Sequence, residues 1–426
     1  MTDVYIFGTW HQGLVISAVL ADSGFFVTCL TDDDEDKKLN SLVLPIFEPG
    51  LDDLIEKGLV SGKLRFRPKF SFKTNKSSVV IFAHDIEVDV HDKSDLDTFY
   101  SDLDLLLNSG NTFANILITS QVPMGTYNSI LEKYKNSTVD LSLRIAVLPE
   151  NLRLGNAIER FRCPPLPVIG CSLTEIKFWK DFFKWTRQDF YFCSQTEAEL
   201  LKHALNGYLA LNIAFGNEIY RLGNNLDADG RTVMNLLKLE PRVGNLAPIR
   251  PGLPFFGGTL ARDLTTMKHI QAESEQQLNL PIITHIIKSN DEHMDFMINK
   301  IVNYPIFKSK KNITVCILGL TYTIATSTLR KSPGEWLTSE LVKRGISVRA
   351  FDPRILPSDL TASLTNDISL LKNYKFDCFI LLSPWPKIEE LIDSIVSDEF
   401  FIDIDGWLTK LKVGLPKNYQ VVFNRS

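Results

Sequence analysis

Apolar strand-like runs alternate with helix-like segments in two separate stretches of this chain, and this alternation is what most constrains the fold. In the N-terminal stretch the runs include VYIF and VVIFA, each followed by turn residues or by the start of a helical pattern. The runs lie at residues 4–7, 26–30, 79–83, 116–119 and 145–148, with helical segments beginning near Gly13, Leu51, Asp95 and Thr126. Apolar strands separated by helices predict a doubly wound parallel sheet.

A second set of strand-like runs follows a long helical segment. Between residues 195 and 222 the hydrophobic period becomes 3.6, and apolar positions cover more of the circumference than one face requires. Such a helix is expected to be buried on several sides, as a spine between domains or a dimer interface would be. After the polar stretch KSKKN, apolar runs recur at residues 313–318, 348–351, 378–382 and 400–404.

We therefore expect an α/β protein with two Rossmann-like doubly wound parallel-sheet domains, joined by a long central helix and a helical dimerisation region. A chain of 426 residues has room for two or three domains. The predicted boundaries are 1–194 for the first sheet domain, 195–300 for the helical region and 301–426 for the second sheet domain.

Composition excludes several classes of partner. The net charge is −5 and no basic stripe is present that could follow a phosphate backbone, so nucleic acid is not expected as a partner. No apolar run reaches about 18 residues, and Met1 leads directly into the VYIF run, so neither a membrane span nor a signal peptide is predicted. The six cysteines show no CxxC spacing and are interpreted as reduced core residues. We expect a cytoplasmic protein.

The turn after the first predicted strand reads GTWHQG, where Rossmann domains have GxGxxG. Gly8 and Gly13 occupy the outer positions, but Trp10 replaces the glycine that lets the backbone approach a dinucleotide pyrophosphate. Asp32 lies one residue beyond the aligned end of the second strand and is a candidate to bind a ribose hydroxyl. Two interpretations stay open: the turn binds a dinucleotide, or it keeps an ancestral conformation after dinucleotide binding was lost.

Residues 252–263, GLPFFGGTLARD, resemble the loop GxGFGGSCFPKD of the UDP-glucose/GDP-mannose dehydrogenase family, the nucleotide-sugar 6-dehydrogenases. Phe255, Gly257 and Asp263 match that loop, and Thr259 stands where the family has its catalytic cysteine. Further segments resemble the family's motifs in the same order along the chain: PIFEPGL at 45–51, SQVPMGT at 120–126, PENLRLG at 149–155, ELLKHALN at 199–206, PRVG at 241–244 and RKSP at 330–333.

The resemblance implies a reaction and a set of site residues. Such enzymes oxidise the sugar C6 alcohol to an aldehyde by hydride transfer to NAD, capture it on the cysteine, oxidise it again to a thioester and hydrolyse that to a uronic acid. The implied catalytic residues are Lys202, Asn206, Asp263, Glu150 and Thr259; the implied NAD contacts are Gly8, Gly13, Asp32, Gln121, Arg262 and Arg330; the implied nucleotide-sugar contacts are Arg242, Phe255 and Gly257. The apolar circumference of the helix at residues 195–222 predicts a symmetric homodimer built on it.

Lys202 and Asn206 are spaced i, i+4, so one helix face can present both to a single oxyanion. Each retained residue also has a structural interpretation: Lys202 as a solvated spine residue, Asn206 as an interhelical hydrogen-bonding residue, and Asp263 as a helix cap. Together and in register they favour a functional site.

Two departures from the family argue against its full chemistry. Thr259 is an alcohol, which needs an adjacent base, whereas a thiolate is nucleophilic near neutral pH. Residues 83–89, AHDIEVD, place carboxylates where the family contributes backbone to NAD, and carboxylates repel a pyrophosphate. His84 and His91 in this region fit no metal-ligand spacing, so we predict a solvated acidic loop and no metal.

Two functions follow as hypotheses. The first is an NAD-linked oxidoreductase of a UDP-type sugar with altered chemistry. The second is a non-catalytic nucleotide-sugar-binding or scaffolding relative that has lost NAD.

Overall fold

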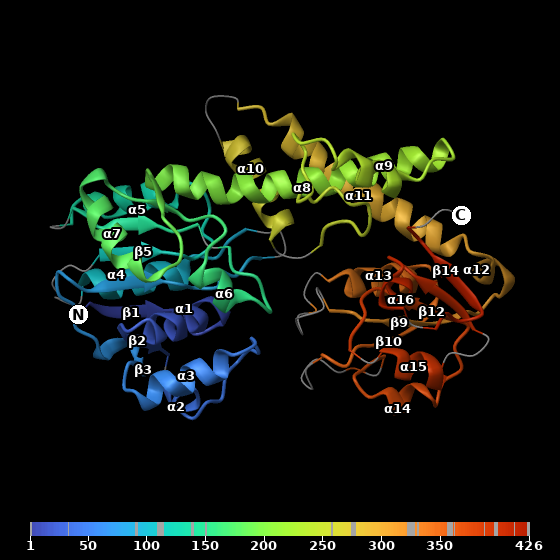
Figure 1. The fold of residues 1–426 in the computed structure, drawn as a ribbon, viewed down its shortest axis with the longest axis horizontal. Helices are drawn as coiled ribbons and strands as arrows, with labels where there is room; N and C mark the ends of the chain where they lie inside the picture. Colours follow the sequence, from blue (N-terminus) through green and yellow to red (C-terminus); the bar gives the residue numbers. More distant parts are fainter. Residues whose placement is uncertain are drawn as a thin grey trace. The chain divides into compact units, whose positions relative to one another are not determined.

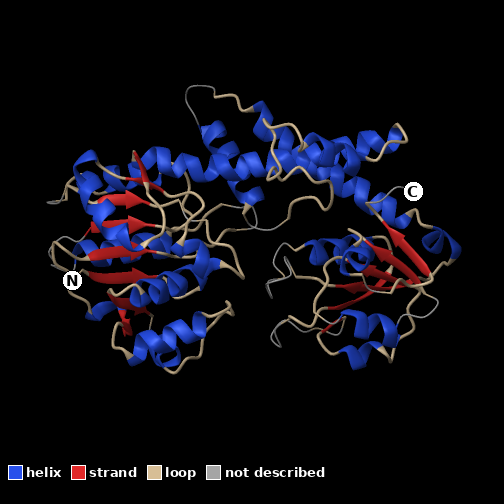
Figure 2. Ribbon diagram, viewed as in Figure 1, coloured by secondary structure: helices blue, strands red, loops and turns tan. Residues whose placement is uncertain are grey.

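The computed structural model describes residues 2–32, 34–89, 93–108, 115–137, 140–149, 151–256, 259–273, 278–321, 329, 332–355, 361, 363–386, 388–395, 399–412 and 414–423. The chain forms two compact units, Met1–Leu205 and Asn206–Ser426. Each unit has its own parallel sheet with helices on its faces (Figure 1, Figure 2). The predicted fold class is confirmed.

The first unit contains an eight-stranded sheet in the order β3-β2-β1-β4-β5-β6-β7-β8. Only the β6–β7 pair is antiparallel among the pairings of these strands. The strands are β1 (Asp3–Phe7), β2 (Phe26–Thr31), β3 (Leu64–Pro68), β4 (Val79–Phe82), β5 (Asn115–Ile118), β6 (Ile145–Val147), β7 (Val168–Gly170) and β8 (Tyr191–Cys193). The order 3-2-1-4-5-6 of the first six strands is that of the Rossmann fold.

Two apolar cores cover the two faces of this sheet. One core contains side chains of α1 (His11–Asp22), α3 (Leu51–Val60), α6 (Ala157–Arg162) and α7 (Ile176–Phe182). The other contains side chains of α4 (Asp97–Asn108) and α5 (Thr126–Lys133). The connections include α2 (Glu35–Asn40) and the 3-10 turns η1 (Lys69–Ser71), η2 (Leu141–Leu143), η3 (Leu173–Glu175) and η4 (Phe183–Trp185).

The predicted central helix is α8 (Gln195–Asn225), which has 31 residues and passes from the first unit into the second. The second unit then contains α9 (Gly230–Leu237), α10 (Leu260–Glu273), α11 (Pro281–Val302) and α12 (Pro305–Ser309). Side chains of α8 and α11 join the core of the second sheet, because Tyr220 and Met297 are buried with its strands.

The second sheet has the order β11-β10-β9-β12-β13-β14, all parallel, which repeats the strand order of the first. Its strands are β9 (Thr314–Leu318), β10 (Ser347–Phe351), β11 (Leu364–Thr365), β12 (Cys378–Leu381), β13 (Phe400–Asp403) and β14 (Asn418–Val421). Its helices are α13 (Pro333–Lys343), α14 (Ile368–Leu371), α15 (Ile388–Ile395) and α16 (Trp407–Leu411). All nine strands predicted from apolar runs are confirmed, within a residue or two at their ends.

Candidate functional site

The turn after β1 depends on both of its glycines. Gly8 has φ +125°, and a Cβ there would lie 2.3 Å from the carbonyl oxygen of Ala83. A Cβ on Gly13 would lie 1.9 Å from the carbonyl oxygen of Gly8. The close packing of β1, α1 and β4 therefore excludes any side chain at either position. These two glycines have a structural reason to be present whether or not a dinucleotide binds.

Trp10 stands at the residue before α1 with extended backbone (φ −96°, ψ −161°) and is 46% exposed. No left-handed conformation is required there, so the turn accepts a side chain without strain. The next two residues are tied down: His11 Nε2 lies 2.9 Å from Glu48 Oε2, and Gln12 donates to the carbonyl oxygen of Thr119 at 2.8 Å. The start of α1 is thus rigid, with an exposed indole at the turn.

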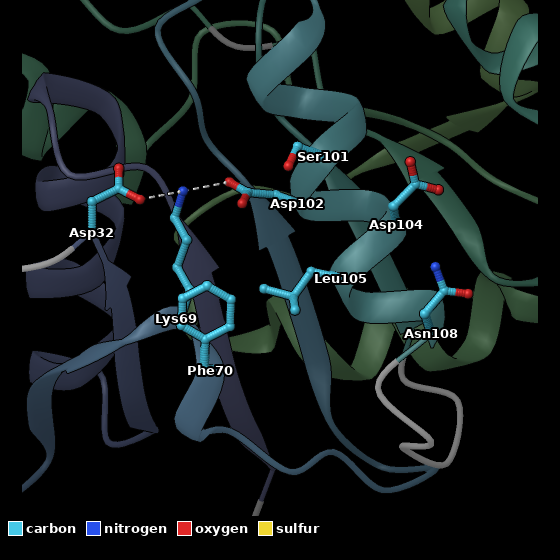
Figure 3. Close-up of a pocket in the computed structure, with 8 residues that line it drawn as sticks. All are labelled: Asp32, Lys69, Phe70, Ser101, Asp102, Asp104, Leu105 and Asn108. Atoms are coloured by element: carbon cyan, nitrogen blue, oxygen red, sulfur yellow. Dashed lines mark ion pairs between the residues drawn. The ribbon is translucent and has the colours of Figure 1, made fainter.

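A cavity of about 470 Å³ adjoins Asp32 at the carboxyl end of β2 (Figure 3). Lys69 separates two carboxylates there, with its Nζ 3.0 Å from Asp32 and 3.0 Å from Asp102. Burial alone would lower the pKa of Lys69, but its hydrogen bonds to the two carboxylates raise it above the ordinary value. The remaining lining residues are Phe70, Ser101, Asp104, Leu105 and Asn108. The space and the exposed Asp32 carboxylate fit the adenosine half of a dinucleotide.

His84 does not belong to a solvated loop, and that part of the prediction is wrong. Its Nε2 lies 2.8 Å from Asp102 Oδ2, and its ring packs against Phe7, Phe82 and Phe99. The aromatic surroundings and the buried carboxylate together hold the imidazole inside the first unit. The acidic residues that follow, Asp85, Glu87 and Asp89, are exposed as predicted, and His91 lies outside the described residues.

Lys202 lies on α8 in the first unit and is held by a neighbouring loop. Its Nζ donates to Asn151 Oδ1 at 3.1 Å, and Asn151 in turn accepts through its carbonyl oxygen from Arg160 Nε at 2.8 Å. Lys202 is therefore oriented by the segment that resembles PEFLREG. Glu150, next to Asn151, lies outside the described residues.

Asn206, one helical turn further along α8, meets Asp263 on α10 inside the second unit. Asn206 Nδ2 donates to Asp263 Oδ2 at 2.5 Å, and Asp263 is fully buried. Arg262 Nε lies 3.9 Å from the other carboxylate oxygen. Thr259 precedes α10, and its carbonyl oxygen accepts from the backbone N–H of Asp263 at 3.1 Å. Asp263 lies in the first turn of α10, where the helix dipole favours a negative charge.

The first part of the loop that resembles the family's active-site loop is clamped by side chains that the sequence analysis did not identify. Asn217 accepts from the backbone N–H of Gly252 at 3.0 Å, and His293 Nε2 lies 2.9 Å from the carbonyl oxygen of the same residue. Asn290 bonds both backbone groups of Phe255, at 2.9 and 3.1 Å. Asn290 and His293 lie on the buried face of α11, and polar residues on the apolar face of a predicted helix are the sequence signal that could have identified them.

The other predicted contacts differ in their surroundings. The Arg242 side chain is 87% exposed and pairs with Glu240 at 2.9 Å. Gln121 follows β5 and is half-buried. Gly257 and Arg330 lie outside the described residues.

A carboxylate at the carboxyl end of β13 collects three cations, which the sequence analysis also did not identify. Asp405 accepts from Arg231 at 2.5 Å, from Arg250 at 2.8 Å and from Lys410 at 2.6 Å. Burial lowers the pKa of Arg231 and that of Lys410 from their ordinary values. Asp229 also lies near Arg231 and favours its charged form, so three cations face two carboxylates and one positive charge is left over.

Both sheets and the glycine turn define a protein of the Rossmann class with a helical spine. Family profiles match three consecutive parts of the chain: the NAD binding domain of the UDP-glucose/GDP-mannose dehydrogenase family at residues 2–183, its central domain at 196–292 and its UDP binding domain at 316–410. The chain belongs to the UDP-glucose/GDP-mannose dehydrogenase family, and the predicted membership is confirmed. This is a family of NAD-dependent nucleotide-sugar dehydrogenases.

Curated relatives match over nearly the whole chain. The UDP-glucose 6-dehydrogenase of Rickettsia bellii is 28% identical over 417 residues, covering 94% of each chain. The GDP-mannose 6-dehydrogenase of Pseudomonas syringae is 25% identical, covering 95% of this chain and 96% of that one. A solved UDP-glucose dehydrogenase from Pyrobaculum islandicum has the same fold, with a TM-score of 0.83, 23% identity and coverage of 99% and 98%. None of the described helices is long and apolar enough to cross a membrane.

His293 should make the second unit sensitive to acid. Burial lowers the pKa of His293 from its ordinary 6.5 to about 4, so the folded state favours the neutral imidazole. Its contribution to stability is complete above pH 6.5 and is lost as the pH falls from 6.5 towards 4, by up to about 3 kcal/mol. The variant His293→Gln lacks this titration, so its free energy of unfolding should depend less on pH than that of wild type. We expect the two free energies to converge as the pH falls from 6.5 towards 4, measured by denaturant titration. His285→Gln, at an exposed site on the same helix, should leave the wild-type pH dependence intact; equal pH profiles for wild type and His293→Gln would contradict the assignment.

Proposed function

We propose that this protein is an NAD-linked oxidoreductase of a UDP-type nucleotide sugar, with chemistry altered at the nucleophile. The observation that carries the proposal is the buried Asn206–Asp263 pair. Asp263 lies one helical turn after Thr259. The three family profiles, including the one for a UDP binding domain, support the substrate class. We retain the three-part division 1–194, 195–300 and 301–426 as part of this proposal.

The roles follow from how the side chains are oriented. Lys202 and Asn206 are one turn apart on α8, so both extend from the same face of the helix. Asn151 holds the Lys202 amine and Asp263 holds the Asn206 amide. Asn206 has a second amide hydrogen, and with the Lys202 ammonium it would stabilise negative charge developing on the sugar C6 oxygen.

Thr259 changes the later chemistry. NAD, when bound, accepts the hydride removed from C6. A threonine hydroxyl is not ionised near neutral pH, so we propose that no stable covalent acyl intermediate forms on this residue. The reaction then either stops at the aldehyde or continues by oxidation of the aldehyde hydrate, in which water supplies the second oxygen and a second NAD would accept the second hydride.

The Asp405 cluster supports a nucleotide ligand in the second unit. Arg231, Arg250 and Lys410 surround Asp405, and with Asp229 also near Arg231 the cluster keeps one surplus positive charge. Arg250 also lies two residues before Gly252, at the start of the clamped loop. A diphosphate is an anion of suitable charge for such a cluster. Phe255, Gly257 and Arg242 remain proposed contacts for the rest of the nucleotide sugar.

The second candidate function is a non-catalytic nucleotide-sugar-binding or scaffolding protein. Trp10 favours it, because an exposed indole stands where a bare glycine backbone would approach the pyrophosphate. The proposed NAD contacts Gly8, Gly13 and Asp32 are compatible with both candidates, since both glycines are required by packing.

Calorimetric titration separates the two candidates. We expect wild type to bind NAD more weakly than UDP-glucose, and Trp10→Gly to tighten NAD binding by about tenfold or more, because it removes bulk from the turn. Binding of UDP-glucose serves as the internal control and should not change. Low-micromolar NAD binding by wild type would remove the scaffold candidate, and no NAD binding by either form would remove the oxidoreductase.

Thr259→Cys tests the nucleophile. If the oxyanion group is intact, this variant should form uronate from a UDP-sugar with two NADH per product, because the restored thiol permits the thioester route. Thr259→Ser keeps a hydroxyl and is the matched control, expected to behave as wild type. The measurements are NADH absorbance and product mass. Two NADH per uronate from the wild-type protein would show that Thr259 does not disable the second oxidation.

We also propose a homodimer built on α8. Four apolar side chains of this helix in the second unit, Tyr208, Leu211, Phe215 and Leu222, are exposed. Their spacing of three, four and seven residues places them on one face. A second copy of the same helix would cover this stripe symmetrically.

Phe215→Glu should weaken the dimer by about tenfold or more, since it places a charge in the middle of the apolar stripe. Sedimentation over a range of concentrations measures the effect. Leu173→Glu, at an exposed apolar site in the first unit, is the control and should leave the association unchanged. A wild-type mass that stays monomeric at every concentration would refute the dimer.

A further inference from the structure

One buried carboxylate joins two segments of the first unit that are far apart in the sequence. Glu48 is 1% exposed and accepts three hydrogen bonds. His11 Nε2 and the backbone N–H of Gly155 lie 2.9 Å from Oε2, and the backbone N–H of Ala157 lies 2.9 Å from Oε1. A buried charge is costly unless it is hydrogen-bonded in this way, so these donors hold their positions together.

The first of these segments is the turn at the start of α1. His11 is the first residue of the helix, directly after Trp10 and three residues after Gly8. Gly13 packs against Gly8 too closely to allow a side chain. The His11 bond therefore ties Glu48 to the turn that we propose as the pyrophosphate end of the dinucleotide site.

The second segment leads to Lys202. Ala157 is the first residue of α6, and Asn156 before it forms no side-chain cap, so Glu48 supplies the acceptor for this helix start. Arg160 on α6 donates to the carbonyl oxygen of Asn151, and the Asn151 side chain accepts from Lys202. Hydrogen bonds therefore connect α6 to Asn151 and Asn151 to the Lys202 amine.

We propose that Glu48 is a positioning residue that couples the α1 turn to the Lys202 amine. The inference rests on the proposed function for its catalytic consequence, because it links the dinucleotide end of the reaction to the residue proposed to stabilise the C6 oxyanion. The coupling itself is a property of the first unit and is measurable without any ligand.

The first test is amide hydrogen exchange on the full chain without ligands. Glu48→Gln should speed exchange at Gly155 and Ala157 by about tenfold, because the new amide N–H₂ cannot accept from both segments. His11→Phe removes a single donor at the far end and should produce the same effect more weakly, while His11→Gln, which keeps an N–H donor, should restore protection. Glu56→Gln on the exposed face of α3 is the matched control. If His11→Phe exchanges these two amides as slowly as wild type does, the coupling is overturned. This result decides the question even if Glu48→Gln does not fold.

The second test follows Lys202 itself. Brief acetylation with acetic anhydride, read by mass spectrometry, should label Lys202 several-fold faster in His11→Phe than in wild type, with exposed Lys177 as the internal reference. Unchanged labelling would limit Glu48 to bracing α6 and overturn its role toward Lys202. NAD and UDP-glucose titrations of the same variants separate the coupling within the first unit from its proposed consequence for catalysis. Failure of wild type to bind NAD would refute the proposed function, and the coupling would still stand or fall on exchange and labelling.

Discussion

Parallel pairing around β1 is the constraint on which the first unit depends. Ile6 lies opposite Cys29 on one neighbouring strand and Ile81 on the other, all three fully or almost fully buried. Strands buried on both faces are continuous apolar runs, and parallel strands end at the same edge of the sheet. Gly8 follows β1 and Asp32 follows β2, so both lie at the same edge of the sheet although they are 24 positions apart in the sequence. The same logic repeats around β9 in the second unit.

Buried carboxylates then hold the loops that emerge from these edges. Glu199 accepts from the backbone N–H groups of Gly125 and Tyr127, and burial raises its pKa in spite of those bonds. Asp352 accepts from the N–H groups that follow β9, and although burial opposes it, Arg354 holds the pKa of Asp352 below its usual range. Each acid satisfies several donors that a turn cannot satisfy within itself. These loops are thereby held by buried charge in addition to the apolar packing of residues such as Tyr127 and Leu320.

Elements whose buried residues recur with a clear hydrophobic period could be predicted from the sequence, and elements with a weak hydrophobic period could not. The apolar run of β1 and the 3.6 period of α8 were recognisable, whereas β3, LRFRP, alternates with exposed arginines at the edge of the sheet and does not resemble a core strand. Motif register placed Asn206 and Asp263 in one predicted group, and these two side chains are hydrogen-bonded in the structure. Partners that depend on packing alone, such as His84 with Asp102, leave no spacing signal because the residue types and separation are unremarkable in a sequence.

The retained residues of the loop and turn carry different weight as signs of activity. Gly8 and Gly13 are explained by close backbone packing, and their presence says nothing about a ligand. Asp263 is different, because a fully buried carboxylate costs stability that an apolar residue of similar volume would avoid. The Asn206 amide, the Arg262 guanidinium 3.9 Å away and the N-terminal end of α10 all offset this cost. The pair joins α8 to α10 and holds the Asn206 amide in one orientation. The proposed contact to the C6 oxyanion requires this orientation, and a structural link between the two helices would produce it as well.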